Sequence, residues 1–375
     1  MTTEVLMFNR LSTQFPLAVS AYVGILLAGG PAPAWAQGTT QEDIPRIQVS
    51  YTQVLSTDSL DAVLAALSPD GRWIVFTGSP GIEESSIWMV SADGGEPFPI
   101  TSGPEYGDGP VWFPGGDRIA YRSGDHIASL AIDPSTGRPA GDPQRVTLEG
   151  SNAYFDISPD GKWIAYTPRG ENGNRVIRVV PSNGGIARTV AEAKTTRPAW
   201  APDGKSIYYV TSRIDSPEQT LMRVRMQEGV RAEGAIPEEV FTYMGYIGTS
   251  TYPGTGFVFL GGRGNPDEPL MVIATLEGRQ LGLVELEKGM FPRSLTSDGR
   301  MLLAERRGER ASPLRVAPVA GGSPRTLQQT DSRALAWTPD GERVLVETAL
   351  DGKERLFLAA VSAGGMTEVR LPEQR

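Results

Sequence analysis

The hydrophobic positions of this chain fall into short runs of β-branched and aromatic residues, each of which follows a polar turn. Segments 73–76, 163–166 and 344–346 are examples, and they read WIVF, WIAY and VLV. Residues of these types in runs of this length favour strands. No segment between the runs shows the period of a long amphipathic helix. The pattern therefore predicts an all-β chain of many short strands.

One tetrapeptide turn precedes these runs and recurs about every 45 residues. Its proline presets φ for a turn, its aspartate can bond its own backbone, and its glycine closes the turn. A repeat of this length is typical of a solenoid, a propeller or an array. Six copies lie at residues 68–71, 113–116, 158–161, 201–204, 296–299 and 338–341, and a degenerate seventh lies at 252–255.

Each copy continues into a third strand, such as residues 87–90, and usually into a fourth after a Gly-Gly turn. Units of four short antiparallel strands predict the blades of a β-propeller. Seven units predict seven blades, and six blades are the alternative if the unit around residues 252–255 is not a full blade. Trp112, Trp200 and Trp337 lie two positions before a turn proline, and we expect them in the core between blades.

The first 36 residues are typical of a secretory signal peptide. Arg10 provides a weak positive charge, residues 16–28 are apolar, and residues 34–36 read AWA, a small-x-small cleavage site. The apolar run of 13 residues is shorter than the roughly 20 that a spanning helix needs. We therefore expect cleavage before Gln37, with a retained membrane anchor as the alternative.

Residues 37–60 are expected to hold a linker and a candidate closing strand, and residues 61–375 the propeller domain. Segment 47–54 alternates between apolar and polar residues like a strand. Such a strand can pair with the blade at the other end of the chain and remove an exposed edge. An extended tail on the surface is the alternative, and the sequence leaves both open.

Composition excludes several classes of chemistry. The net charge of −9 disfavours a nucleic-acid partner, because such proteins normally carry a basic stripe. The absence of cysteine excludes thiol catalysis and cysteine-ligated clusters. His126 is the only histidine, so one chain cannot build a Ser-His-Asp triad with a further histidine or a two-histidine zinc site. We expect His126 in a solvated loop between two strands.

Residues 155–166 and 198–209, which contain the third and fourth turns, resemble the repeat of the TolB-type β-propeller. The resemblance extends over nearly all of residues 61–371 and implies a propeller. It implies little about function, because the repeat occurs in TolB, in the propeller half of prolyl oligopeptidase-like enzymes and in accessory envelope domains. We expect no α/β domain like the one that precedes the TolB propeller, because the repeats leave no room for it. We also expect no hydrolase domain like that of the peptidases, because the sequence has no Gly-x-Ser-x-Gly elbow.

The turn aspartates are regularly placed, but aspartate is favoured at that position of a turn. We therefore assign them a structural role rather than a role as a ring of metal ligands. The residues just ahead of the innermost strands are better candidates, because those connections converge on one mouth of the central channel. Tyrosine and arginine with an acid are typical of a recognition face. The candidate partner-binding residues are Tyr106, Asp108, Asn152, Tyr154, Arg197, Tyr246, Arg293 and Arg333.

The sequence thus predicts a non-enzymatic, monomeric, periplasmic or secreted bacterial propeller that binds a protein or peptide partner of the cell envelope at the channel mouth. No catalytic residue, metal ligand, cofactor or nucleic-acid partner is expected, and no stable membrane insertion once the leader is cleaved. The alternative is a calcium-dependent, lactonase-like propeller hydrolase that uses channel carboxylates, since oxygen ligands suit calcium and need neither cysteine nor histidine.

Overall fold

The computed structural model describes strands and turns, with no helix in the described residues. These residues are 47–53, 61–79, 85–102, 107–148, 152–168, 175–193, 198–212, 218–244, 246–249, 257–261, 270–275, 280–285, 290–295, 301–306, 314–318, 325–328, 332–350 and 353–363. No helix long and apolar enough to span a membrane occurs in this part of the chain.

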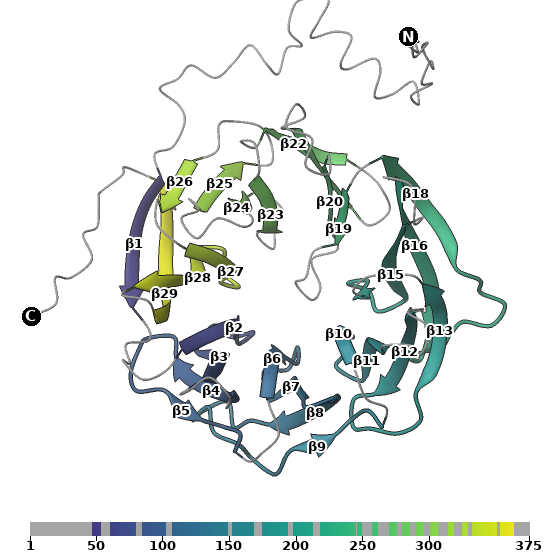
Figure 1. Ribbon diagram of the computed structural model, residues 1–375, viewed down its shortest axis with the longest axis horizontal. Coiled ribbons are helices and arrows are strands. Elements are labelled where there is room, and N and C mark those ends of the chain that lie inside the picture. Colours follow the sequence, from purple (N-terminus) through teal and green to yellow (C-terminus); the bar gives the residue numbers. More distant parts are fainter. Residues whose placement is uncertain are drawn as a thin grey trace, which may run out of the picture. The chain divides into compact units, whose positions relative to one another are not determined.

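The described strands form seven antiparallel sheets, which Figure 1 shows in chain order from purple to yellow. Sheet 1 holds β2 (Asp61–Leu67), β3 (Trp73–Ser79), β4 (Ser86–Ser91) and β5 (Phe98–Pro99). Sheet 2 holds β6 (Gly107–Trp112), β7 (Arg118–Ser123), β8 (His126–Ala131) and β9 (Gln144–Arg145). Sheet 3 holds β10 (Asn152–Ile157), β11 (Trp163–Pro168), β12 (Arg175–Pro181) and β13 (Arg188–Ala193).

Sheet 4 differs by a fifth strand, because the ten-residue β16 pairs with β17 at one end and with β18 at the other. Sheet 4 holds β14 (Ala199–Trp200), β15 (Ser206–Ser212), β16 (Glu218–Gln227), β17 (Val230–Arg231) and β18 (Glu238–Met244). Sheet 5 holds β19 (Tyr246–Thr249), β20 (Phe257–Gly261), β21 (Leu270–Thr275) and β22 (Gln280–Glu285). Sheet 6 holds β23 (Met290–Leu295), β24 (Met301–Arg306), β25 (Leu314–Pro318) and β26 (Arg325–Gln328).

Sheet 7 joins the two ends of the described chain. It holds β27 (Ser332–Trp337), β28 (Arg343–Leu350), β29 (Lys353–Ala363) and, as its outer strand, β1 (Ile47–Gln53). Ile47 lies opposite Ala363, and Gln53 lies opposite Phe357. Of the two alternatives for segment 47–54, the structure has the paired strand. Because β2 also contacts β27, β28 and β29, the last sheet packs on the first, as a β-propeller requires.

The hydrophobic core lies between neighbouring sheets. Trp112 packs with Ile87 and Met89 of sheet 1, and Trp200 packs with Ile177 and Val179 of sheet 3. Trp112, Trp200 and Trp337 are all buried, which agrees with their expected role in the core. The indole Nε1 of Trp112 donates a hydrogen bond of 3.2 Å to the carbonyl of Ala66. Large residues of one sheet therefore fit against small residues of the sheet before it.

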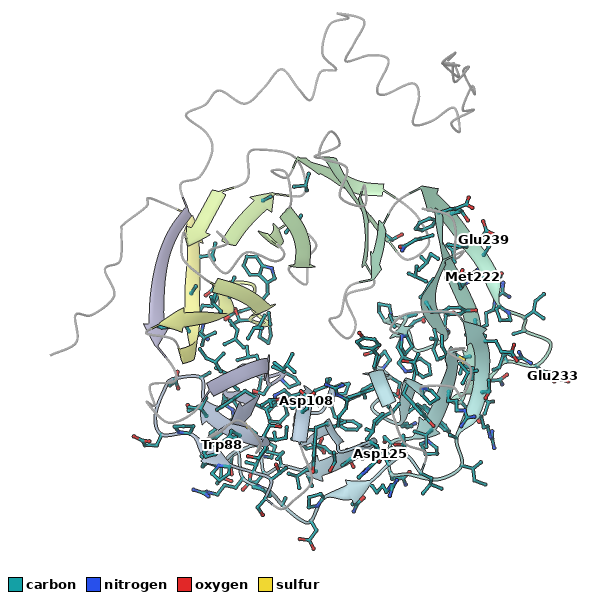
Figure 2. The ribbon with its side chains drawn as sticks, in the orientation of Figure 1. Trp88, Asp108, Asp125, Met222, Glu233 and Glu239 are labelled. Carbon is teal, nitrogen blue, oxygen red and sulfur yellow. The ribbon has the colours of Figure 1, made fainter. Side chains whose placement is uncertain are left out.

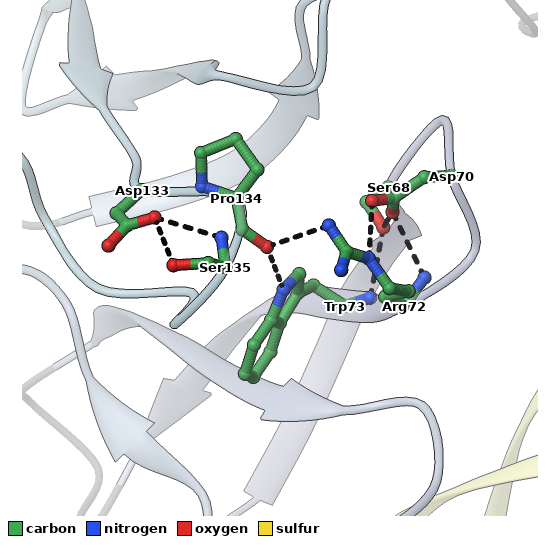
Figure 3. A network of polar contacts seen from close by, with 7 residues as sticks. All are labelled: Ser68, Asp70, Arg72, Trp73, Asp133, Pro134 and Ser135. Carbon is green, nitrogen blue, oxygen red and sulfur yellow. Dashed lines mark hydrogen bonds and ion pairs between the residues drawn. The ribbon is translucent and has the colours of Figure 1, made fainter.

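The repeated turn satisfies its own polar groups (Figure 3). The Ser68 hydroxyl donates to Asp70 Oδ1 over 2.6 Å and accepts the N–H of Trp73 over 2.9 Å, and Asp70 also accepts the N–H of Arg72. The same bonds recur from Ser158 to Trp163 and from Thr338 to Arg343. Sequence reasoning recognised the Pro-Asp-Gly part of the turn but missed the buried hydroxyl that begins it.

Connections between outer strands fold back from one sheet onto the previous one at this turn end. The carbonyl of Pro134, between β8 and β9, accepts two hydrogen bonds, one from Trp73 Nε1 over 2.9 Å and one from Arg72 Nη2 over 3.1 Å (Figure 3). Gly229, between β16 and β17, lies on the ring of Trp163, where an added Cβ would come within 2.0 Å of Cδ2. Only glycine fits this contact at the observed φ of +71°.

His126 is not in a solvated loop, contrary to the sequence prediction. It is the first residue of β8, and it is only 8% exposed. Gly124 adopts a φ of +56°, and Ser123 already pairs with His126, so the hairpin has only two loop residues. A connection this short leaves the imidazole within the sheet, where its Nδ1 lies 3.6 Å from Asp125 Oδ1.

Candidate partner-binding site

The first strand of each sheet runs toward the repeated turn, and we call its opposite end the mouth end. Five of these strands in the described chain carry a β-bulge. A bulge bends a strand and re-aims its side chains, and bulges are common next to functional sites. The register shifts fall between Val63 and Ala66, Asp108 and Val111, Asn152 and Tyr154, Pro292 and Ser294, and Ala334 and Ala336.

Three predicted site residues lie at one level of their sheets. Asp108 is opposite Arg122, Tyr154 is opposite Thr167, and Arg333 is opposite Glu347. In each sheet a large residue ends the first strand just before the turn and pairs with a residue of the second strand. Arg122, Thr167 and Glu347 each lie three positions after that paired residue. The structure therefore brings Asp108, Tyr154 and Arg333 to equivalent places at the mouth end.

The other predicted residues divide into two groups. Arg293 lies within the bulge of β23, and Asn152 and Tyr246 begin β10 and β19. Asn152 and Tyr246 are at the mouth end, whereas Arg293 lies nearer the turn end than the level of Asp108. Tyr106 and Arg197 lie outside the described residues.

Asp108 forms an ion pair across the strands with Arg122, whose Nη2 donates to Oδ2. The aspartate side chain is 10% exposed and the arginine side chain 34% exposed. The second oxygen, Oδ1, is buried and has no hydrogen-bond partner. Figure 2 labels Asp108 on the inner strand β6, whereas Glu233 and Glu239 lie on the outer part of sheet 4. Sequence reasoning missed Arg122. Thr77 and Thr167 occupy the equivalent positions in sheets 1 and 3, so sheet 2 differs from both by carrying an arginine there.

Leu64 has a left-handed backbone in the bulge of β2, with φ of +53°. Gly109 occupies the equivalent position in β6 with φ of +61°. Such a conformation suits glycine but strains a leucine, and strain of this kind clusters at functional sites. The Leu64 side chain is 42% exposed instead of contributing fully to the core. Nothing in the local sequence marked Leu64, because the strain depends on the bulge.

Tyr154 is the second large apolar side chain exposed on an inner strand, at 36%. Two positions further on, Asp156 lies where β2 and β27 carry the small residues Ala66 and Ala336. Its Oδ2 accepts the Trp200 N–H of sheet 4 over 2.7 Å, and its Oδ1 accepts the Ile157 N–H. Burial of the carboxyl raises the pKa of Asp156 to about 7, although both hydrogen bonds act to lower it.

The described side chains include no group of three or more His, Cys, Asp or Glu residues that could hold a metal ion. The described mouth end therefore combines one ion pair, two exposed apolar side chains and a strained bulge. This arrangement can bind a ligand by contact and hydrogen bonding.

No protein-family model matches the chain. The protein Atu1656 of Agrobacterium fabrum, whose name assigns no activity, is 25% identical over 237 residues, which cover 60% of this chain and 71% of that protein. Among solved structures, oligogalacturonate lyase in complex with manganese has a TM-score of 0.62 and 14% identity, over 85% of this chain and 97% of the lyase.

Prolyl endopeptidase is matched with a TM-score of 0.54 and 14% identity, over 81% of this chain and 50% of that one. TolB from Acinetobacter baumannii has a TM-score of 0.40 and 17% identity, over 82% of this chain and 64% of that one. At these identities the lyase and the endopeptidase show the fold alone. They support a β-propeller fold for this chain.

Proposed function

We propose that this propeller is a non-enzymatic binding protein that holds a protein or peptide partner at its mouth end. The supporting observation is the exposure of Leu64, Arg122 and Tyr154 on three consecutive sheets. Tyrosine and arginine are enriched where interfaces concentrate their binding energy. The turn aspartates Asp70 and Asp160, by contrast, hydrogen-bond within their own turns.

We place this activity in the bacterial periplasm or outside the cell, because the first 36 residues have the composition of a secretory leader. The partner would then be a protein or peptide of the cell envelope, and the mature chain would begin at Gln37. These leader residues lie outside the described part of the structure.

A calcium-dependent hydrolase is the second candidate, supported by the enzymatic fold neighbour oligogalacturonate lyase. Two described carboxylates of the inner strands already have other partners. Asp108 is paired with Arg122, and Asp156 joins sheets 3 and 4 through Trp200. Binding is therefore the function that the described geometry supports best.

Affinity capture from an envelope extract, with residues 37–375 as bait, tests this proposal. Changing Arg197, Arg293 and Arg333 together to alanine should reduce capture at least fivefold and leave the Tm nearly unchanged. The matched control changes Arg188, Lys205 and Arg231, which are exposed elsewhere, to alanine.

Equal loss of capture in both triple variants would contradict a site at the mouth end. A Tm titration with calcium runs in parallel. Saturable stabilisation by calcium, with no protein retained, would favour the hydrolase and overturn the binding proposal.

A further inference from the structure

We propose that Arg122 anchors a carboxylate of the partner, so that the bound segment is an acidic peptide with apolar neighbours. This inference rests on the proposed function and names the chemistry of its ligand. It adds a residue, Arg122, that the sequence did not single out, and it assigns Asp108 the role of positioning that residue.

The guanidinium of Arg122 is held by Asp108 and lies beside the bulge of β6. Its Nη2 donates to Asp108 Oδ2. Its Nε and Nη2 also lie over Gly109, where an added Cβ would be 3.8 Å from Nε and 4.0 Å from Nη2. The bulge that contains Gly109 is itself fixed, because Gly109 N–H donates to Thr77 Oγ1 of sheet 1 over 3.1 Å. A side chain fixed in this way loses little conformational entropy when a ligand binds.

The remaining donors of Arg122 define the ligand. A guanidinium has five N–H donors in a planar fork, and the hydrogen bonds described for Arg122 use only the one to Asp108. The side chain is 34% exposed, whereas Asp108 is 10% exposed. A ligand therefore meets the arginine rather than the aspartate. A carboxylate matches the planar fork best, because it can accept two parallel hydrogen bonds.

The apolar neighbours favour a peptide over an acidic sugar. Leu64 follows Val63, which is opposite Thr77, the residue that bonds Gly109. Leu64 is therefore close to the bulge of β6 on one side, and Tyr154 is the first residue after the bulge of β10 in the sheet on the other side. Both side chains are exposed, so a bound segment can bury apolar side chains beside its carboxylate.

A random heptapeptide library with free C-terminal carboxylates, selected on the mature chain, tests the inference directly. The selected peptides should carry Asp, Glu or the terminal carboxylate next to Leu, Phe or Tyr. The best synthetic peptide should bind R122Q at least tenfold more weakly than wild type, and R122K should recover only part of that loss. Its Gln or amide analogue should also lose at least tenfold in affinity.

Asp108→Asn separates the roles of the two residues. If Asp108 only positions Arg122, this variant retains affinity within about threefold, because the arginine keeps its donors. Should R122Q fold poorly, the double variant D108N/R122Q removes both charges of the pair and gives the same loss of peptide binding in a folded protein.

Four results would overturn the inference: peptides selected for Lys or Arg, no enrichment at all, unchanged binding by R122Q, or preference for trigalacturonate over every peptide. The proposed function fails separately, through the capture experiment with the arginine triple variant. A protein captured at the mouth end without any need for Arg122 would leave the proposed function standing and remove this inference.

Discussion

The charged side chains at the two ends of the sheets differ in how fully they are hydrogen-bonded within the protein. At the turn end, Asp70 accepts hydrogen bonds from Ser68 and Arg72, and Asp160 and Asp340 repeat the arrangement. At the mouth end, Asp108 leaves one oxygen unpaired, and its partner Arg122 remains one-third exposed. The polar groups of the repeated turn end are therefore hydrogen-bonded within the turn, whereas the polar groups of the variable mouth end keep capacity to bind a ligand.

The pKa shifts show the same contrast. Burial would raise the pKa of Asp70, but hydrogen bonds from the Ser68 hydroxyl and the Arg72 N–H lower it. Asp160 and Asp340 follow the same pattern. For Asp156, burial outweighs the two backbone hydrogen bonds, and the pKa rises to about 7. At the turns, local hydrogen-bond donors lower the pKa of the aspartates. Between sheets 3 and 4, burial raises the pKa of Asp156.

Gly229→Ala should give the largest loss of stability, because the added methyl meets the Trp163 ring. We expect about 3 kcal/mol lower free energy of unfolding, from overpacking together with the left-handed backbone. Gly234→Ala is the matched control, with φ of +69° and nothing within 4 Å of the added Cβ. It should cost about 1 kcal/mol. Urea unfolding measures both, and equal losses would contradict a turn-end contact between sheets 3 and 4.

Asp156 should make the free energy of unfolding fall as pH rises. Its folded pKa of about 7 exceeds the ordinary value of 3.8, so between these values the folded state binds more protons than the unfolded state. The stabilisation is complete below about pH 4 and lost as pH rises through about 7. One pKa unit is worth about 1.4 kcal/mol, and because Asp156 keeps some solvent contact we expect about 2 kcal/mol.

Comparison of wild type with Asp156→Asn isolates this effect from other titrating groups. The difference between their unfolding free energies should change by this amount from pH 4 to pH 8. The turn aspartates have lowered pKa values, so their stabilisation is lost below pH 4, outside this window. Parallel pH profiles for the two proteins would show that Asp156 is not desolvated.

Ser158→Ala should cost about 1 to 2 kcal/mol, because the N–H of Trp163 and the carboxylate of Asp160 each lose a buried partner. Ser158→Thr should retain most of the stability, since Thr338 makes the same bonds. Partner capture should be unaffected in both variants. Reduced capture by a folded Ser158→Ala protein would break the distinction between the two ends.

Leu64→Asn should have the smallest effect on stability, and of opposite sign. Asparagine tolerates the left-handed backbone better than leucine, so the variant should gain up to about 1 kcal/mol. It should nevertheless bind the partner more weakly, because an exposed apolar contact is lost. Higher affinity, or a clear loss of stability, would show that Leu64 serves the core instead.

The turn and the strand pattern could be predicted because they depend on neighbouring residues. The mouth-end position of Asp108, Tyr154 and Arg333 could be predicted for the same reason, since each lies five or six residues before a turn proline. Arg122 and Leu64 could not, because their roles depend on cross-strand register and on a bulge. The prediction for His126 is wrong, because the tight connection consists of Gly124 and Asp125 alone and His126 already belongs to the next strand.

Site-specific photocrosslinking in the envelope extract tests the division between the ends most directly. A benzoylphenylalanine at position 154 samples the mouth end, and one at position 203, an exposed turn residue, samples the turn end. We predict a discrete crosslinked partner from position 154 and none from position 203. A partner crosslinked from position 203 alone would contradict recognition at the mouth end.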